Sequence, residues 1–87
     1  MRGMDATKRF VYLLQSESQP SRYYTGLTAN VQTRLRAHNE GRSRHTASSG
    51  PWRVIVALEF ADEAHAVAFE RYLKSGSGCA FSKRHFR

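Results

Sequence analysis

The chain is poor in acidic residues and in cysteine. Its 87 residues hold 7 Asp and Glu against 14 Lys and Arg, which gives a net charge of +7. This imbalance favours a polyanionic partner, and nucleic acid is the first candidate. Cys79 is the single cysteine. An internal disulfide is therefore excluded, and a cytoplasmic protein is the simplest expectation.

Long apolar runs are also missing. No stretch approaches the ~20 apolar residues that cross a bilayer, so we expect no association with a membrane. Residues 1–8 lack the apolar segment of a signal peptide. We expect them to form a flexible N-terminal tail, followed by one domain over residues 9–87, which has room for only a thin core.

The first half of the chain reads as two strands and a helix. A continuous apolar run within residues 8–15 predicts a strand buried on both faces, as in the centre of a sheet. Residues 22–27 form the next strand, and the short loop between the two favours an antiparallel hairpin. Thr28 or Asn30 then caps a helix that runs to about Asn39.

The second half reads as a polar loop, a strand and a helix. Apolar residues alternate from Trp52 to Phe60, which predicts the third strand. Asp62 caps a second helix that runs to about Lys74, where a Ser/Gly segment ends it and leaves at most a small terminal element. We therefore expect an α+β fold of order β-β-α-β-α, with a small three-stranded antiparallel sheet flanked by helices.

Helical geometry separates the two arginines of the first helix. At about 100° per residue, Arg34 and His38 lie on one edge of the apolar stripe, whereas Arg36 faces away from it. Arg34 and His38 can therefore border a cleft beside the core, while Arg36 should face water or a distant phosphate. From geometry alone, Arg34 could equally be an arginine whose stem simply covers an amphipathic edge.

Glu70 falls inside the apolar arc of the second helix. A carboxylate in that position needs a partner or a metal ion, because burial of an unpaired charge is costly. An ion pair with Arg71, Lys74 or another helix would also satisfy it. Tyr12 and Tyr24 lie in predicted strands, where tyrosine commonly serves only for packing.

Together these residues resemble the GIY-YIG nuclease superfamily, and most closely its small single-domain bacterial members. Phe10-Val11-Tyr12 stands in the place of the first triplet, and Tyr24-Thr25-Gly26 stands in the place of the second. The stretch from Arg34 to Gly41 looks like the first helix of the superfamily, and the one from Phe69 to Lys74 looks like its metal-binding helix. The resemblance covers residues 9 to about 85.

The resemblance implies an endonuclease that hydrolyses DNA phosphodiester bonds with a single divalent metal, Mg²⁺ or Mn²⁺. DNA repair or the processing of branched DNA is the expected setting. Tyr12 would deprotonate or orient the attacking water, Tyr24 would lie near the scissile phosphate, and Arg34 would be the essential arginine. Glu70 would be the metal ligand.

The base that accepts the proton of water stays open between Tyr12 and His38. Tyrosine has an ordinary pKa of about 10, so it would need Arg34 or the metal to lower that pKa. His38 has a better pKa for the role. The chain also lacks an asparagine after Asn39, although some members of the superfamily have one in the site.

Basic residues supply the expected DNA-binding surface. Lys and Arg contacts to phosphates give affinity that depends on salt and little on sequence. The candidates are Arg36, Arg42, Arg44, Lys74, Lys83 and Arg84. Two alternatives to a self-sufficient endonuclease remain, namely a catalytically weak nucleic-acid-binding module and a subunit that needs a partner protein for activity or specificity.

Overall fold

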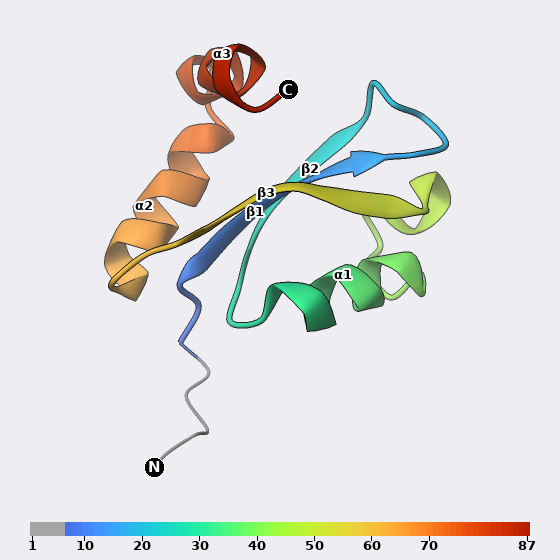
Figure 1. Ribbon diagram of the computed structural model, residues 1–87, viewed down its shortest axis with the longest axis horizontal. Helices are drawn as coiled ribbons and strands as arrows, with labels where there is room; N and C mark the ends of the chain where they lie inside the picture. Colours follow the sequence, from blue (N-terminus) through green and yellow to red (C-terminus); the bar gives the residue numbers. More distant parts are fainter. Residues whose placement is uncertain (1–6) are drawn as a thin grey trace.

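The computed structural model describes residues 7–87 and shows a three-stranded antiparallel sheet with helices on both faces (Figure 1). Strand β1 (Phe10–Ser16) lies in the middle, between β2 (Tyr23–Thr28) and β3 (Trp52–Glu59), and runs antiparallel to both. The predicted fold class, the hairpin and the central position of the first strand are confirmed. The tail predicted at residues 1–8 falls mostly on residues 1–6, which lie outside the described residues.

The helices begin where the sequence places capping residues. Helix α1 (Val31–Asn39) is capped by Asn30, whose side chain accepts a hydrogen bond from the Thr33 amide at 2.9 Å. Helix α2 (Glu63–Leu73) is capped by Asp62 through a 2.8 Å bond from the His65 amide. Both side chains satisfy amides that the first turn of a helix leaves unpaired.

Alternate residues of β1 face different helices. Val11 packs with Ala66 and Leu73 of α2, whereas Tyr12 and Leu14 belong to a second cluster. That second cluster includes partly buried residues of α1, and Figure 1 shows α1 on one side of the sheet and α2 on the other. The side chain of Tyr12 therefore lies on the α1 side of the sheet.

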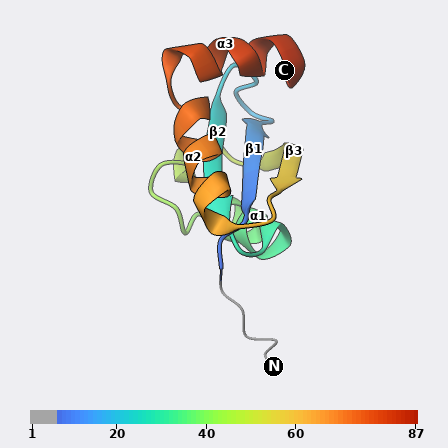
Figure 2. The ribbon, with the colours of Figure 1, turned by 90° about the vertical axis from the view of Figure 1, so that its left-hand side faces the viewer.

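A third helix, α3 (Gly76–His85), directly follows α2 and lies across one end of the sheet (Figure 2). The prediction of at most a small terminal element was wrong in extent. Ser75 caps this helix by accepting a bond from the Gly78 amide at 3.1 Å. A Cβ atom on Gly78 would lie only 1.9 Å from the carbonyl oxygen of Tyr72. Glycine in this segment therefore permits close packing of α3 on α2 besides ending α2.

A short 3-10 turn (Ala47–Ser49) interrupts the loop between α1 and β3. Among residues 7–87, no helix combines the length and the apolar character that crossing a membrane requires.

Candidate active site

The phenol of Tyr12 is held where the two triplets pair. Tyr12 is 1% exposed and lies opposite Gly26 in the ladder between β1 and β2. A Cβ atom on Gly26 would lie 2.4 Å from both the oxygen and Cζ of Tyr12. Only a glycine leaves room for the phenol there, so the second triplet shapes the site through a missing side chain.

The hydroxyl of Tyr12 contacts the imidazole of His38. Its oxygen lies 2.9 Å from His38 Nε2, and the His38 ring also packs on Tyr24 with ring centroids 4.8 Å apart. His38 is 1% exposed. The expectation that His38 borders a cleft is therefore wrong, because the two tyrosines and the following loop cover it. It has no surface left for direct contact with a phosphate.

Thr46 holds the other nitrogen of His38. Its Oγ1 lies 2.7 Å from His38 Nδ1, and its hydroxyl also points at the carbonyl of Ser43 at 3.5 Å. A hydroxyl has one proton, so donation to that carbonyl leaves Oγ1 to accept from Nδ1–H. His38 Nε2 then carries no proton and accepts from the Tyr12 hydroxyl. The contacts thus favour one tautomer, with Nε2 facing the phenol.

Sequence reasoning missed Thr46, because the segment from Gly41 to Gly50 reads only as a polar, basic loop. In the structure Ser43, Thr46 and Ser49 are buried. The sequence does show that these residues are three positions apart. That spacing places three small polar side chains on the same, inner side of a loop that winds in turns. Trp52 anchors this loop by donating from Nε1 to the carbonyl of Thr46 at 2.8 Å.

The environment keeps both Tyr12 and His38 neutral. Burial raises the pKa of Tyr12, and the nearby Tyr24 and Glu70 act in the same direction, whereas a hydrogen bond from Arg34 lowers it. The net shift is upward, opposite to the lowering that a tyrosine base would need. Burial and, after it, the charge of Arg34 lower the pKa of His38. Neither side chain therefore carries a charge near neutral pH.

The two arginines of α1 differ as helical phase predicts. Arg34 is partly buried, its hydrogen bond lowers the pKa of Tyr12, and its charge lowers the pKa of His38. Arg36 is exposed and faces away. The structure thus brings Tyr12, Tyr24, Arg34 and His38 together on one side of the sheet.

Glu70 reaches the same region from α2. Its charge acts on Tyr12, and its carboxylate forms an ion pair with Lys74, one turn further along the helix, at 2.5 Å. This is the ion-pair alternative that the sequence left open. Within residues 7–87 there is no cluster of three or more His, Cys, Asp or Glu side chains that could hold a metal. Glu70 is therefore not part of a ready-made set of three protein ligands for a metal.

Lys74 also lines a hollow beside the site. This hollow, of about 380 Å³, includes Tyr24 of β2 and His45 of the loop after α1. It therefore joins residues from both layers at the β2 edge of the sheet. Lys74 is placed to meet an anion there, although its present partner is Glu70.

The other expected DNA-binding residues lie in two separate places. Arg36, Arg42 and Arg44 are exposed on α1 and the following loop, and Arg42 pairs with Glu40 at 2.6 Å. Lys83 and Arg84 are exposed on α3, where they line a different hollow.

Comparisons with known proteins point to one family. The family model described as the GIY-YIG catalytic domain matches residues 8–80. A structure-specific endonuclease subunit SLX1 of Scheffersomyces stipitis is 42% identical over 67 aligned positions, covering 69% of this chain and 20% of the relative. SLX1 of Debaryomyces hansenii is 39% identical, covering 74% of this chain and 20% of the relative. The SLX1 homologue of Drosophila persimilis is 36% identical, covering 69% and 24%.

The chain spans only about a fifth to a quarter of the length of these relatives. They come from yeasts and a fly, so they lend no support to the expected likeness to bacterial members. No solved structure matches significantly. The matched residues include both triplets, the Arg34 helix and Glu70, and the chain belongs to the GIY-YIG family of nuclease catalytic domains.

Proposed function

We propose that this domain hydrolyses phosphodiester bonds at branched sites in DNA, with a divalent metal ion as cofactor. The observation that carries the proposal is the hydrogen-bonded chain from Tyr12 through His38 to Thr46, with Arg34 beside it and Glu70 near enough for its charge to act on Tyr12. Such a chain gives a proton a path away from the reaction centre, and the two charged residues suit a phosphate and a metal.

In this mechanism Tyr12 and His38 act in series. Tyr12 is as buried as His38, so DNA binding must first open a way to its hydroxyl. Water then attacks the phosphorus and passes its proton to the Tyr12 oxygen, while Tyr12 passes its own proton to His38 Nε2. Because the pKa of Tyr12 is raised, a free phenolate is disfavoured, and this relay avoids one. The lowered pKa of His38 leaves it unprotonated and ready to accept. His38 is thus a positioning and proton-accepting residue that works through Tyr12.

Arg34 and Tyr24 would handle the phosphate. The guanidinium presents several donors in a fixed plane, which suits a phosphate that gains charge during attack. Tyr24 lines the hollow at the β2 edge, where a phosphate could approach from solvent. Preorganised donors of this kind stabilise the transition state more than the ground state.

The residues fit a single Mg²⁺ or Mn²⁺ ion held by Glu70. Its carboxylate is largely buried and oxygen-only, and such ions accept one or two protein carboxylates with water and phosphate oxygens as the other ligands. When bound, the ion would polarise the phosphoryl group and stabilise the leaving oxygen. Lys74 must release Glu70 for this, and it would then be free to contact DNA.

The substrate class and a partner protein are proposed from the relatives. Their names describe structure-specific endonuclease subunits. We infer that this domain likewise acts on branched DNA, in repair or a related process, and that a partner protein contributes to its specificity. The exposed basic residues Arg36, Arg42 and Arg44 would hold the duplex arms through their phosphates.

The test is cleavage of labelled single-stranded, duplex, flap and branched DNAs in Mg²⁺ or Mn²⁺. We expect wild-type cleavage of branched DNA and none by Glu70→Gln, which keeps the size of the side chain and removes its charge. DNA affinity measured in EDTA should be similar for both proteins. Equal cleavage by the two would remove Glu70 from the site.

A catalytically weak binding module remains the second candidate, because the Glu70–Lys74 ion pair competes with a metal for the same carboxylate. Binding of branched DNA without cleavage by wild type would select this candidate. Lys74→Gln frees Glu70 but also removes a cation that would contact DNA, so cleavage is compared at saturating DNA. There it should increase if the ion pair is what limits metal-dependent cleavage.

A further inference from the structure

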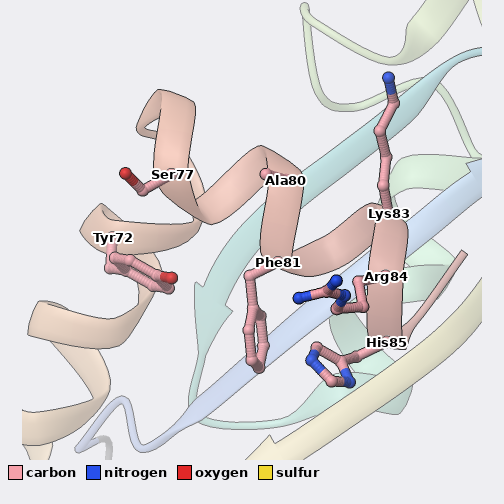
Figure 3. A pocket seen from close by; sticks show the side chains of 7 residues that line it. All are labelled: Tyr72, Ser77, Ala80, Phe81, Lys83, Arg84 and His85. Carbon is pink, nitrogen blue, oxygen red and sulfur yellow. The ribbon is translucent and has the colours of Figure 1, made fainter.

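The outer face of α2 and α3 carries a hollow of about 690 Å³ that the proposed mechanism does not use. Figure 3 shows the side chains around it, with Tyr72 from α2 and Phe81, Lys83, Arg84 and His85 from α3. It shares no lining residue with the hollow next to Tyr24, to which α3 contributes Cys79 and Ser82. This surface, called the α2–α3 patch below, is therefore distinct from the candidate active site.

Its aromatic side chains form a supported platform. Tyr72 is 41% exposed and is the one exposed large hydrophobic side chain among residues 7–87. Its ring packs edge-on against Phe81 with centroids 6.0 Å apart, and Phe81 is itself held by Phe69 at 6.2 Å and Phe86 at 5.4 Å. The Tyr72 ring is thus held by its aromatic neighbours while much of it stays exposed, and an exposed, supported ring suits a stacked base.

The charge around the platform has one sign. Residues 71–87 contain five Lys and Arg and no Asp or Glu. Lys83 and Arg84 are exposed at the patch, and within the described part of the chain neither forms an ion pair with a carboxylate. These two cations therefore stay available for phosphates.

We propose that the α2–α3 patch binds single-stranded nucleic acid, with a base stacked on Tyr72 and the backbone phosphates on Lys83 and Arg84. A duplex keeps its bases stacked on one another and would leave Tyr72 unused, whereas an unpaired strand uses both the ring and the cations. This inference rests on the proposed function for its substrate, since branched DNA of the flap type supplies an unpaired strand beside a duplex.

The path between the two places is short along the chain. Tyr72 faces the patch, and Lys74, two residues later, pairs with Glu70 and lines the hollow beside Tyr24. The last turn of α2 therefore contributes to both places.

The experiment measures fluorescence anisotropy of labelled oligo(dT) of about 12 nucleotides, within the range of single-strand sites, and of a duplex of equal length. EDTA is present throughout, so cleavage plays no part. We expect Tyr72→Ala to weaken oligo(dT) binding by about 10-fold, in line with the loss of one stacked base, and to change duplex binding little. Tyr72→Phe should bind as wild type, because the ring is retained.

The charged variant gives an independent reading. The double variant Lys83→Gln/Arg84→Gln should also weaken oligo(dT) binding more than duplex binding. Arg36 is an exposed cation on α1, so Arg36→Gln should not weaken oligo(dT) binding more than duplex binding. Unchanged oligo(dT) binding by Tyr72→Ala, or an equal loss for the duplex, would overturn the proposal. Displacement of oligo(dT) by poly-glutamate as readily as by unlabelled oligo(dT) would also overturn it and indicate an acidic protein segment as the occupant.

The same proteins are then assayed for cleavage of a flap in Mn²⁺, beside Glu70→Gln. Loss of oligo(dT) binding in Tyr72→Ala supports the patch even where wild type cleaves nothing. Cleavage by wild type with no effect of Tyr72→Ala on oligo(dT) binding supports the nuclease and rejects the patch. The two proposals therefore fail in different measurements.

Discussion

Replacement of Gly26 by alanine should disable the site without touching a reactive side chain. The new Cβ would lie 2.4 Å from the oxygen and Cζ of Tyr12, where carbon atoms ordinarily keep about 3.5–4.0 Å. The phenol must therefore move by roughly 1 Å, and because it is buried in a close-packed interior its neighbours must move with it. A shift of that size disturbs the hydrogen bond between its oxygen and His38, which are now 2.9 Å apart.

Both stability and activity should fall. Forcing a methyl group into a packed core costs about 1–3 kcal/mol, and loss of the hydrogen bond between Tyr12 and His38 adds about 1 kcal/mol. We expect the free energy of unfolding to drop by about 2–4 kcal/mol in urea denaturation. Cleavage of branched DNA should fall by about 100-fold, as for other displacements near 1 Å of a reactive group.

A double-mutant cycle identifies the cause. Tyr12→Leu removes the outer ring atoms and the hydroxyl, so Gly26→Ala should cost little stability in that background. Gly76→Ala is the matched control, because a Cβ there meets nothing within 4 Å. If Gly26→Ala lowers the free energy of unfolding equally with and without the Tyr12 ring, the clash is not the reason and the argument fails.

Three further outcomes follow from the site. Arg34→Ala should slow cleavage by about 100–1000-fold and Arg36→Ala by far less; equal kinetic effects would refute the assignment from helix faces. Thr46→Val leaves His38 Nδ1–H without an acceptor, so it should lower the free energy of unfolding by about 1–3 kcal/mol and slow cleavage, whereas Thr46→Ser should restore both. The pKa of His38 is lowered from 6.5 in the folded chain, so the unfolded chain takes up the proton first. The free energy of unfolding should therefore fall as the pH drops below about 6.5 towards that lowered pKa. Urea titrations at several pH values should show that His38→Gln lacks this pH dependence; an unchanged dependence would show that His38 is not its source.

Local patterns predicted most of the fold because they depend on neighbours in the chain. The unbroken apolar run of β1 marked the central strand, and Asn30 and Asp62 marked the helix starts, since a cap acts within three residues of itself. The phase of α1 separated Arg34 from Arg36 for the same reason. The two triplets pointed to the family that the comparisons then identified.

The burial of His38, the inward turn of Thr46 and the pairing of Glu70 with Lys74 were decided only by the tertiary structure. A loop has no period from which its inner side can be read. The direction in which the pKa of Tyr12 moves depends on how far packing removes it from water, and here burial outweighs Arg34.

The sequence by itself determined which residues could carry the chemistry and which local elements hold them, because helix phase, strand alternation and capping are properties of short segments. The tertiary structure decided which of these residues touch one another and at what cost in solvation. It also placed an aromatic and basic face on α3, a helix that the Ser/Gly segment had hidden from sequence reasoning.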